Sequence, residues 1–234
     1  MILPRANMVE AILFDFDLTL ADSSAAVTEC ANHALRALGL AAAEPGLVHQ
    51  TIGLSLVQSF RALSGNDDPG LGAAYAKHFG EHADRVMAEL IDLYPGAADT
   101  IRDLRGRGLR TAIVSTKFRY RIEDILNRAN ASGLVDVIVG GEDVAQHKPH
   151  PEGLLRALRL LDVHPSRAVY VGDHSVDALA AASAEIPFIG VLTGATDADS
   201  WAAFAPLRII AGVTELSAVL DHFLDPAASD ADAD

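Results

Sequence analysis

The sequence has little that would cross-link the chain or direct it into a membrane. Cys30 is the only cysteine, so no disulfide forms within the chain, and we expect Cys30 to be a small core residue in a reducing compartment. No stretch approaches the roughly 18 apolar residues of a membrane span. Residues 1–10 lack the apolar region of a signal peptide. These absences predict a cytoplasmic protein with no membrane partner.

Positive charge is also scarce. The chain has 18 Lys and Arg against 32 Asp and Glu, a formal net charge of -14. A phosphate backbone would be repelled, so we expect no nucleic-acid partner. Small anionic substrates are not excluded, because physiological salt screens charge beyond about 8 Å and local groups then decide. With 50% hydrophobic residues, the 234-residue chain can bury a large core.

Short runs rich in Val and Ile recur along the chain, with helical patterns between them. Continuous apolar runs are typical of parallel strands that are covered on both faces. We expect strands from Ala11 and over 110–115, 135–140, 168–173, 187–192 and 208–212. We expect helices over 97–108, 118–129, 151–163 and 175–185. This alternation predicts an α/β fold with a Rossmann-like parallel-sheet core.

One long segment interrupts the alternation. It contains helical patterns over 23–38, 54–63 and 71–90, separated by turn-forming sequences, and no convincing strand. The prediction is therefore an inserted all-helical cap domain with two flanking parts of one core. The ranges are 21–94 for the cap, 8–20 and 95–224 for the core, and 225–234 for an acidic, disordered tail.

Polar side chains follow four of the expected strands, at the point where each strand ends. They are Asp15 and Asp17 after the first strand, Ser115 and Thr116 after the second, Lys148 after the third, and Asp173 and Asp177 after the fourth. In open parallel sheets, ligands bind beyond the carboxyl ends of the strands. We therefore expect these side chains to surround one site.

The residue types at this edge are compatible with phosphoryl chemistry. Clustered carboxylates repel one another unless a cation lies among them, and all-oxygen ligands suit Mg²⁺. Lysine and serine side chains suit phosphate oxygens. A carboxylate can attack phosphorus to form an aspartyl-phosphate, and a second one can act as acid and base.

Each residue also has a structural interpretation when taken alone. Asp15 and Asp17 could be a helix cap and a turn residue, and Asp177 could be an acid in the first turn of a helix. The basic run 117–121 could be a solvated helix start, or Lys117 and Arg119 could reach a substrate anion.

Two parts of the cap are candidates for contact with a leaving group. They are the loop 49–56 and Arg61. Simple packing of Leu54 and Leu56, and a surface charge for Arg61, are the alternatives.

Four motifs in order resemble those of the haloacid dehalogenase superfamily, on its phosphatase side. They are "DFDLT" (15–19), Ser115 in "IVSTK", Lys148 in "HKPHPE" and "GDHSVD" (172–177). The helical insert is similar to the small cap of that family. Residues 94–117 and 140–158 resemble the phosphoglycolate phosphatase branch and its pyrophosphatase relatives.

This resemblance implies the chemical roles of three aspartates. Asp15 would attack phosphorus, and Asp17 would protonate the leaving oxygen and then activate water. Asp15, the backbone carbonyl of Asp17, and Asp173 would hold Mg²⁺. The cofactor that the resemblance implies is therefore Mg²⁺.

The resemblance also implies the supporting roles. Ser115, Thr116 and Lys148 would bind the phosphoryl group. Asp177 would act from behind these groups by orienting Lys148, and Thr19 would support the loop after the first strand.

The chain departs from the family pattern at two places. Leu18 stands where relatives usually carry Gly, so the backbone there must tolerate a side chain, and a leucine could narrow the site entrance. Residues 180–191 lack the usual Asn-Ala-Gly before the fifth strand. Neither change removes a catalytic group, but both weaken an assignment of the substrate by similarity.

The function that follows is an expectation from this resemblance. It is a Mg²⁺-dependent phosphatase of a small phosphorylated metabolite, phosphoglycolate phosphatase-like, acting as a monomer or homodimer. The alternatives are an inorganic pyrophosphatase of the same family and a sugar-phosphate mutase. A dehalogenase is disfavoured, because Asp17 would have no acid or base task at a carbon–halogen bond.

Overall fold

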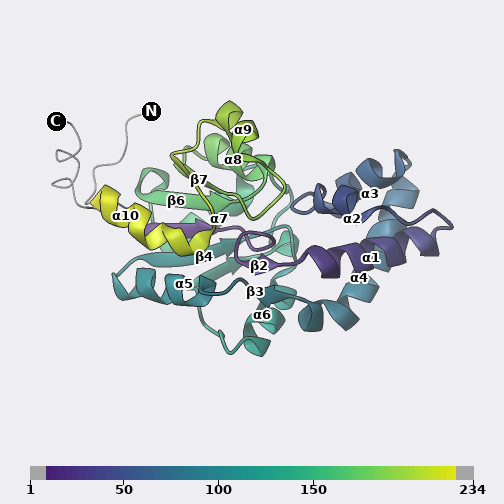
Figure 1. The fold of residues 1–234 in the computed structure, drawn as a ribbon, viewed down its shortest axis with the longest axis horizontal. Helices are drawn as coiled ribbons and strands as arrows, with labels where there is room; N and C mark the ends of the chain where they lie inside the picture. The colour runs from purple at the N-terminus through teal and green to yellow at the C-terminus, as the bar shows by residue number, and fades with distance from the viewer. Residues whose placement is uncertain (1–8, 225–234) are drawn as a thin grey trace.

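A six-stranded parallel sheet lies at the centre of the protein, whose computed structural model describes residues 9–224 (Figure 1). The strand order is β5 (Val137–Val139), β4 (Arg110–Val114), β1 (Ala11–Phe14), β6 (Ala168–Gly172), β7 (Phe188–Val191) and β8 (Arg208–Ile210). Every neighbouring pair is parallel. Each strand lies within the segment that the sequence predicted, which confirms the α/β fold. The predicted tail, 225–234, lies outside the described residues.

Helices cover both faces of the sheet. One face packs on α5 (Ala97–Gly106), α6 (Arg119–Arg128) and α10 (Leu216–Leu224), and the other on α7 (Glu152–Leu161), α8 (Ser175–Ser183) and α9 (Ala198–Trp201). Four short 3-10 helices complete this part: η2 (Gly141–Asp143), η3 (Pro165–Arg167), η4 (Ala202–Phe204) and η5 (Val213–Glu215). Because Ile12 and Phe14 face one layer and Leu13 the other, β1 is apolar at every position.

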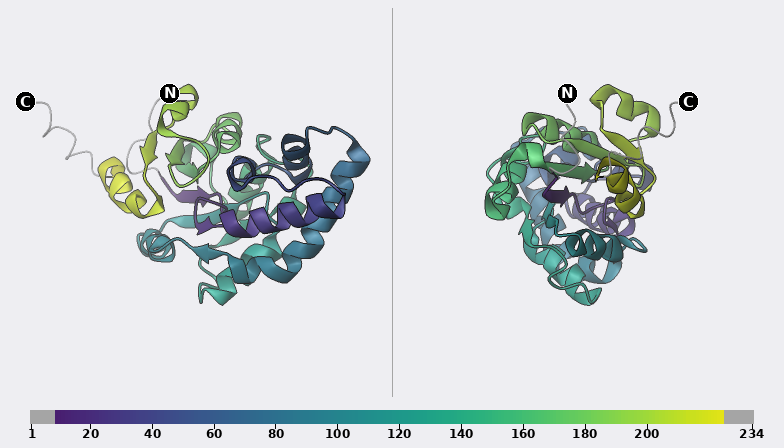
Figure 2. Two further views of the ribbon diagram at one scale, coloured as in Figure 1. Left: turned by 45° about the vertical axis from the view of Figure 1, so that its right-hand side comes forward. Right: turned by 90° about the vertical axis from the view of Figure 1, so that its left-hand side faces the viewer.

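The cap consists of α1 (Ser24–Ala37), α2 (Pro45–His49), α3 (Leu56–Ser64) and α4 (Pro69–Leu90). Helices α1 and α4 pack along each other beyond one end of the sheet (Figures 1 and 2). Ser55 and Gln58 form a capping box at the start of α3, and Asp68 caps α4. Cys30 is buried with the apolar side chains of the cap, as predicted.

The prediction that the inserted segment contains no strand is wrong at its two ends. Strands β2 (Ala21–Asp22) and β3 (Asp92–Leu93) form a short antiparallel pair where the chain leaves the core and returns to it. The two connections run side by side, and the Tyr94 amide donates to the Leu20 carbonyl. Two residues per strand are too few to produce a sequence pattern. Helices α2, α9 and α10 were not predicted either.

The order of the strands places a crevice at the carboxyl end of β1. From β1 the chain builds β4 and β5 on one side, and then β6, β7 and β8 on the other. Such a switch of direction is where open α/β sheets bind ligands. The cap follows directly after β1, so it lies over this end of the sheet (Figure 1). In the described range 9–224, no helix is long and apolar enough to cross a membrane.

Candidate active site

A buried lysine lies at the centre of the site. The Lys148 Nζ atom is 2.8 Å from Asp15 Oδ1 and 2.5 Å from Asp177 Oδ1. It also donates to the Tyr170 hydroxyl at 3.2 Å. Burial by itself lowers the pKa of Lys148, but the carboxylates of Asp15 and Asp177 outweigh that effect and raise it overall. Lys148 is therefore a permanent positive charge between two aspartates.

Asp177 serves both of the functions that the sequence left open. It lies in the first turn of α8, where its Oδ2 accepts from the His174 amide at 3.0 Å. Its Oδ1 accepts from Lys148 and from the Tyr170 hydroxyl, the latter at 2.9 Å. Both of its oxygens are thus engaged, so Asp177 orients Lys148 and also caps the helix. A Cβ on Gly172 would lie 2.7 Å from this carboxylate, so only glycine leaves room for it.

Asp15 and Asp173 follow adjacent strands, β1 and β6, and have oxygens that no hydrogen bond satisfies. Ligand atoms of Asp15, Asp173 and Asp177 all lie within 4.8 Å of one another. Thr19 donates to Asp173 Oδ1 at 3.0 Å, which fixes that side chain. Asp15 Oδ2 and Asp173 Oδ2 are buried and accept no hydrogen bond from the described residues. Since Asp177 is fully engaged, Asp15 and Asp173 are the two carboxylates that remain for a cation.

Burial sets the acidity of these two carboxylates. It raises the pKa of Asp15 to about 7, against the opposing effect of Lys148. It also raises the pKa of Asp173 well above its ordinary value, and the charges of Asp177 and Asp15 add to that effect. A cation between the two side chains would favour their ionised forms.

The buried charges of the site do not balance. When all are ionised, four aspartates and two lysines leave two negative charges. These residues are Asp15, Asp17, Asp173, Asp177, Lys117 and Lys148. One divalent cation would restore neutrality, and the donors are all oxygens, the set that Mg²⁺ prefers. The residues present therefore fit a divalent metal ion.

Asp17 faces a different lysine. Lys117 Nζ is 3.2 Å from Asp17 Oδ1 and 3.1 Å from the Met87 sulfur of the cap, and it is buried. The carboxylate of Asp17 is absent from the three-aspartate cluster, so only its backbone carbonyl is left for the metal role that the resemblance implied. Of the two basic candidates, Lys117 lies in the site, whereas Arg119 is exposed and lies 3.5 Å from Asp143.

Ser115 and Thr116 follow β4 at the same end of the sheet, but their side chains have different neighbours. The Ser115 hydroxyl accepts from the Lys117 amide at 3.2 Å. The Thr116 hydroxyl donates to the Gly53 carbonyl of the cap loop at 3.4 Å. Thr116 thus contacts the cap, and its expected role in phosphate binding stays a prediction.

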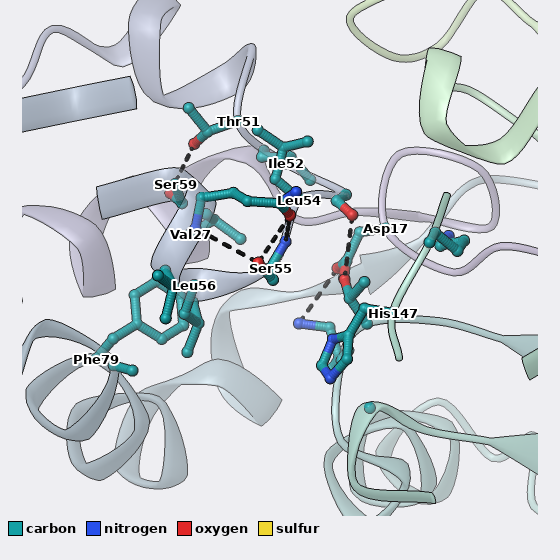
Figure 3. A pocket seen from close by; sticks show the side chains of 18 of the residues that line it. Asp17, Val27, Thr51, Ile52, Leu54, Ser55, Leu56, Ser59, Phe79 and His147 are labelled. Atoms are coloured by element: carbon teal, nitrogen blue, oxygen red, sulfur yellow. Dashed lines mark hydrogen bonds and ion pairs between the residues drawn. The ribbon is translucent and has the colours of Figure 1, made fainter. Parts of the chain in front are cut away.

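A cavity of about 690 Å³ lies between the cap and the core, beside Asp17 (Figure 3). The loop predicted to read the leaving group lines it through residues 51–56. Lys117, His147 and Lys148 line it from the core. Arg61 does not belong to the lining. It is exposed and pairs with Asp67, so the surface-charge interpretation holds for it.

Leu18 does not narrow the entrance, as the sequence had suggested it could. Its side chain is fully buried and does not line the cavity. Its φ of 59° lies in the left-handed region, which costs a residue with a Cβ roughly 1–2 kcal/mol. The preference for glycine in relatives therefore matches the backbone conformation, and the leucine offsets the strain by burying its side chain.

We expect Leu18→Gly to be more stable than Leu18→Ala by about 1 kcal/mol, because only glycine is free of the left-handed strain. Both variants lose a buried side chain, at a cost of about 2–5 kcal/mol. Urea unfolding of both proteins measures the difference. Leu20, also buried but without a positive φ, is the control: there the alanine variant should be the more stable. If the glycine variant were the more stable one at both positions, backbone strain at Leu18 would not explain the difference.

Several residues of the site were not found from the sequence. Tyr170 sits in an apolar strand, and only the polar tip of its side chain hints at its hydrogen bonds to Asp177 and the Val114 carbonyl. No motif or pattern in the sequence indicated that Met87 and His147 would lie at the site. Gly194 lies so close to Asp173 that a Cβ there would be 1.9 Å from Asp173 Oδ2. Such approaches depend on tertiary packing, which no local pattern encodes.

Comparison with known proteins agrees with this geometry. Residues 12–191 match the family model of haloacid dehalogenase-like hydrolases. The chain is 33% identical over 213 residues to a plasmid-encoded phosphoglycolate phosphatase of Cupriavidus necator, covering 90% of this chain and 92% of the relative. It is 32% identical over 169 residues to pyrophosphatase PpaX of Bacillus cereus, covering 72% and 76%.

A solved structure shows the same fold. The crystal structure of a protein from Bacteroides fragilis, described as haloacid dehalogenase-like, superimposes with a TM-score of 0.86 at 38% identity. The match covers 89% of this chain and 99% of that one. The helical insert and the sheet are therefore shared over nearly the whole length of both chains.

Proposed function

We propose, since the chain belongs to the haloacid dehalogenase-like hydrolase family, that it is a Mg²⁺-dependent phosphatase of a small phosphorylated metabolite. The observation that carries this is the arrangement at Asp15. Its buried carboxylate has one oxygen free of hydrogen bonds and the other 2.8 Å from the Lys148 ammonium. That is how a nucleophile and a phosphate-binding cation would have to lie.

In the first step, an oxygen of Asp15 forms a bond to phosphorus while the bond between phosphorus and the leaving oxygen breaks. Asp17 enters this step protonated and gives that proton to the leaving oxygen, after which its carboxylate pairs with Lys117. In the second step, water attacks phosphorus, Asp17 takes its proton, and the bond to Asp15 breaks to release phosphate. Asp17 suits this work because it lines the cavity where the leaving group would lie.

Lys148 and Ser115 hold the phosphoryl group, and Asp15 and Asp173 would hold Mg²⁺. A bound divalent ion offsets negative charge on the phosphoryl oxygens. Thr19 keeps Asp173 in place, and Asp177 with Tyr170 keeps Lys148 in place. The cap lies over these groups and limits the access of water to them.

The names of the relatives give the first substrates to test, phosphoglycolate and pyrophosphate. A sugar-phosphate mutase would use the same Asp15 but return the phosphoryl group to a sugar phosphate. The cytoplasmic location and the monomeric or homodimeric state stay predictions from the sequence.

Phosphate release tests the proposal directly. We expect release from at least one phosphate ester with Mg²⁺, and a rate at least about 100-fold lower in EDTA, because unneutralised carboxylates repel a phosphate dianion. Added Mg²⁺ should restore the rate. Release that EDTA leaves unchanged would contradict the metal role. Transfer of labelled phosphate to an added sugar phosphate, with little to water, would favour the mutase.

Lys117→Met is expected to lower kcat by about 10–100-fold with a smaller change in KM, because it removes the cation that holds Asp17 in place. Steady-state kinetics on the best ester measure this. Arg119→Met is the matched control: it removes a cation two positions away, outside the cavity, and should leave kcat within about twofold. Equal effects of the two variants would mean that Lys117 does not act through Asp17.

A further inference from the structure

The cavity beside Asp17 is larger than the substrates named for the relatives require. Its volume of about 690 Å³ falls in the range of roughly 300–1,000 Å³ that holds drug-sized ligands. Glycolate and a second phosphate would fill only a small part of it. The rest of the space leaves room for a larger leaving group.

The size of this cavity does not come from an undocked cap. Lys117 contacts the Met87 sulfur at 3.1 Å. Arg121, on the core, pairs with Asp84 at 2.6 Å and donates to the Gly80 carbonyl at 3.0 Å. At the cap loop, Thr116 reaches Gly53. The cap thus contacts the core through its loop and through α4, and the cavity lies between these contacts with one side open to solvent.

The end of the cavity that is formed by the cap is largely apolar, although Thr51, Ser55, Gln58 and Ser59 also line it. Figure 3 shows Val27, Leu56 and Phe79 from the cap on one side of the space, and Asp17 and His147 on the other. These three side chains come from α1, α3 and α4. A leaving group that extends from the phosphoryl site toward the cap would meet hydrocarbon.

The described cations that line the cavity all have contacts on the core side or with α4, and none lies at the apolar end. Among the described residues of the lining, Lys148 faces the phosphoryl site, Lys117 is paired with Asp17, and Arg121 is paired with Asp84. Burial lowers the pKa of His147, which favours its neutral form. A carboxylate or a second phosphate at the cap end would find no positive partner.

The hydroxyls of the cap loop are also engaged with one another. Ser59 donates to the Thr51 hydroxyl at 3.0 Å, and Thr51 donates to the Val48 carbonyl at 2.8 Å. Ser55 donates to the Gln58 side chain at 2.7 Å. These three hydroxyls are therefore not free donors for the hydroxyls of a sugar, whose burial would need hydrogen bonds.

We propose that the substrate is the phosphate monoester of an uncharged, mainly apolar alcohol whose hydrocarbon part packs against Val27, Leu56 and Phe79. This inference rests on the proposed phosphatase function. The proposed substrate differs from phosphoglycolate and pyrophosphate in both size and charge. Its recognition would depend on the apolar side chains of the cap.

A series of n-alkyl phosphates from ethyl to hexyl tests this, because their leaving groups have nearly the same acidity and differ only in apolar length. We expect kcat/KM to rise about three- to fourfold per methylene, and about 80- to 250-fold over the four methylenes of the series. Phosphoglycolate and pyrophosphate should both fall below hexyl phosphate. A flat or falling series, or a higher kcat/KM for either anion, would overturn the inference while leaving the phosphatase function intact.

Leu56→Asp places a charge at the apolar end, in the first turn of α3, where an acid suits the helix. We expect it to lower kcat/KM for hexyl phosphate at least about tenfold and for ethyl phosphate less than about twofold. Leu71→Asp makes the same change in the first turn of α4, outside the cavity, and should leave both values unchanged. Equal losses on both esters in Leu56→Asp would overturn the assignment.

Calorimetric titration with n-alkylphosphonates separates the two proposals. These compounds keep the phosphorus dianion but cannot be hydrolysed. Affinity that rises with chain length supports the assignment of the apolar end as the binding site for the hydrocarbon part, even if no ester is hydrolysed and the phosphatase function fails. Affinity that is independent of chain length overturns the inference, whatever the kinetics show.

Discussion

Asp15→Asn is expected to abolish phosphate release, lowering kcat by at least about 10⁴-fold. An amide keeps the shape of the side chain but cannot form the bond to phosphorus. Its loss also leaves Lys148 with Asp177 as its only carboxylate partner within 3 Å among the described residues. The measurement is phosphate release under saturating substrate and Mg²⁺, against wild type in the same buffer.

The fold of Asp15→Asn should not be weaker than wild type in EDTA. Because burial raises the pKa of Asp15 to about 7, its ionised form costs folding free energy, and that cost grows as the pH rises from about 4 through about 7. Asparagine has no such charge, so the melting temperature at pH 8 should be equal or higher. Inactivity with a lowered melting temperature would instead point to misfolding.

Trapping the intermediate gives a second readout. Acid quenching of wild type during turnover, followed by mass spectrometry, should find a phosphoryl group on the peptide that contains Asp15, and none in Asp15→Asn. A labelled peptide from another part of the chain, or activity of the variant within about tenfold of wild type, would show that the nucleophile lies elsewhere.

The sheet and the principal carboxylates could be predicted because they depend on local pattern. A continuous apolar strand that ends in charged residues places those residues at the edge of the sheet, whatever the rest of the chain does. Asp15 and Asp173 are therefore visible in the sequence, and the motif that contains Lys148 is equally local. The pairing of β1 with both β4 and β6 then brings them together.

The partners of these groups could not be predicted, because they are set by packing between distant segments. Lys117 contacts Met87, which lies near the C-terminal end of α4 and 30 positions away in the chain. Arg121 finds Asp84 in the same way, 37 positions away. From the sequence, both residues belong to one basic run, and only the docking of the cap distinguishes them from the exposed Arg119.

The size and polarity of the cavity are also set by packing between distant segments. Leu54 and Leu56 could be either packing residues or lining residues, and the sequence offered no means to choose. The choice is made by the position of α3 relative to Phe79 and Val27, three segments that share no local pattern. This is why motifs can predict the reaction while the leaving group has to be inferred from the cap.

Lys148→Met is expected to lower both stability and activity. The lysine is the only cation within 3 Å of Asp15 and Asp177 among the described residues. Removing one partner of a buried ion pair leaves uncompensated charge and typically costs about 3–5 kcal/mol. Urea unfolding in EDTA should show a loss of this size. We expect kcat to fall at least about 10³-fold, because the phosphoryl group loses its cation.

A double variant separates the two effects of Lys148. Adding Asp177→Asn to Lys148→Met removes one of the carboxylates left unbalanced, while the amide can still accept from the Tyr170 hydroxyl, so stability should recover by about 1–3 kcal/mol. Activity should stay low, because the phosphoryl site still lacks its cation. Mg²⁺ should stabilise the single variant more than wild type, since the ion then supplies the missing positive charge. If the double variant were less stable than the single one, the lysine would contribute through packing and not through charge.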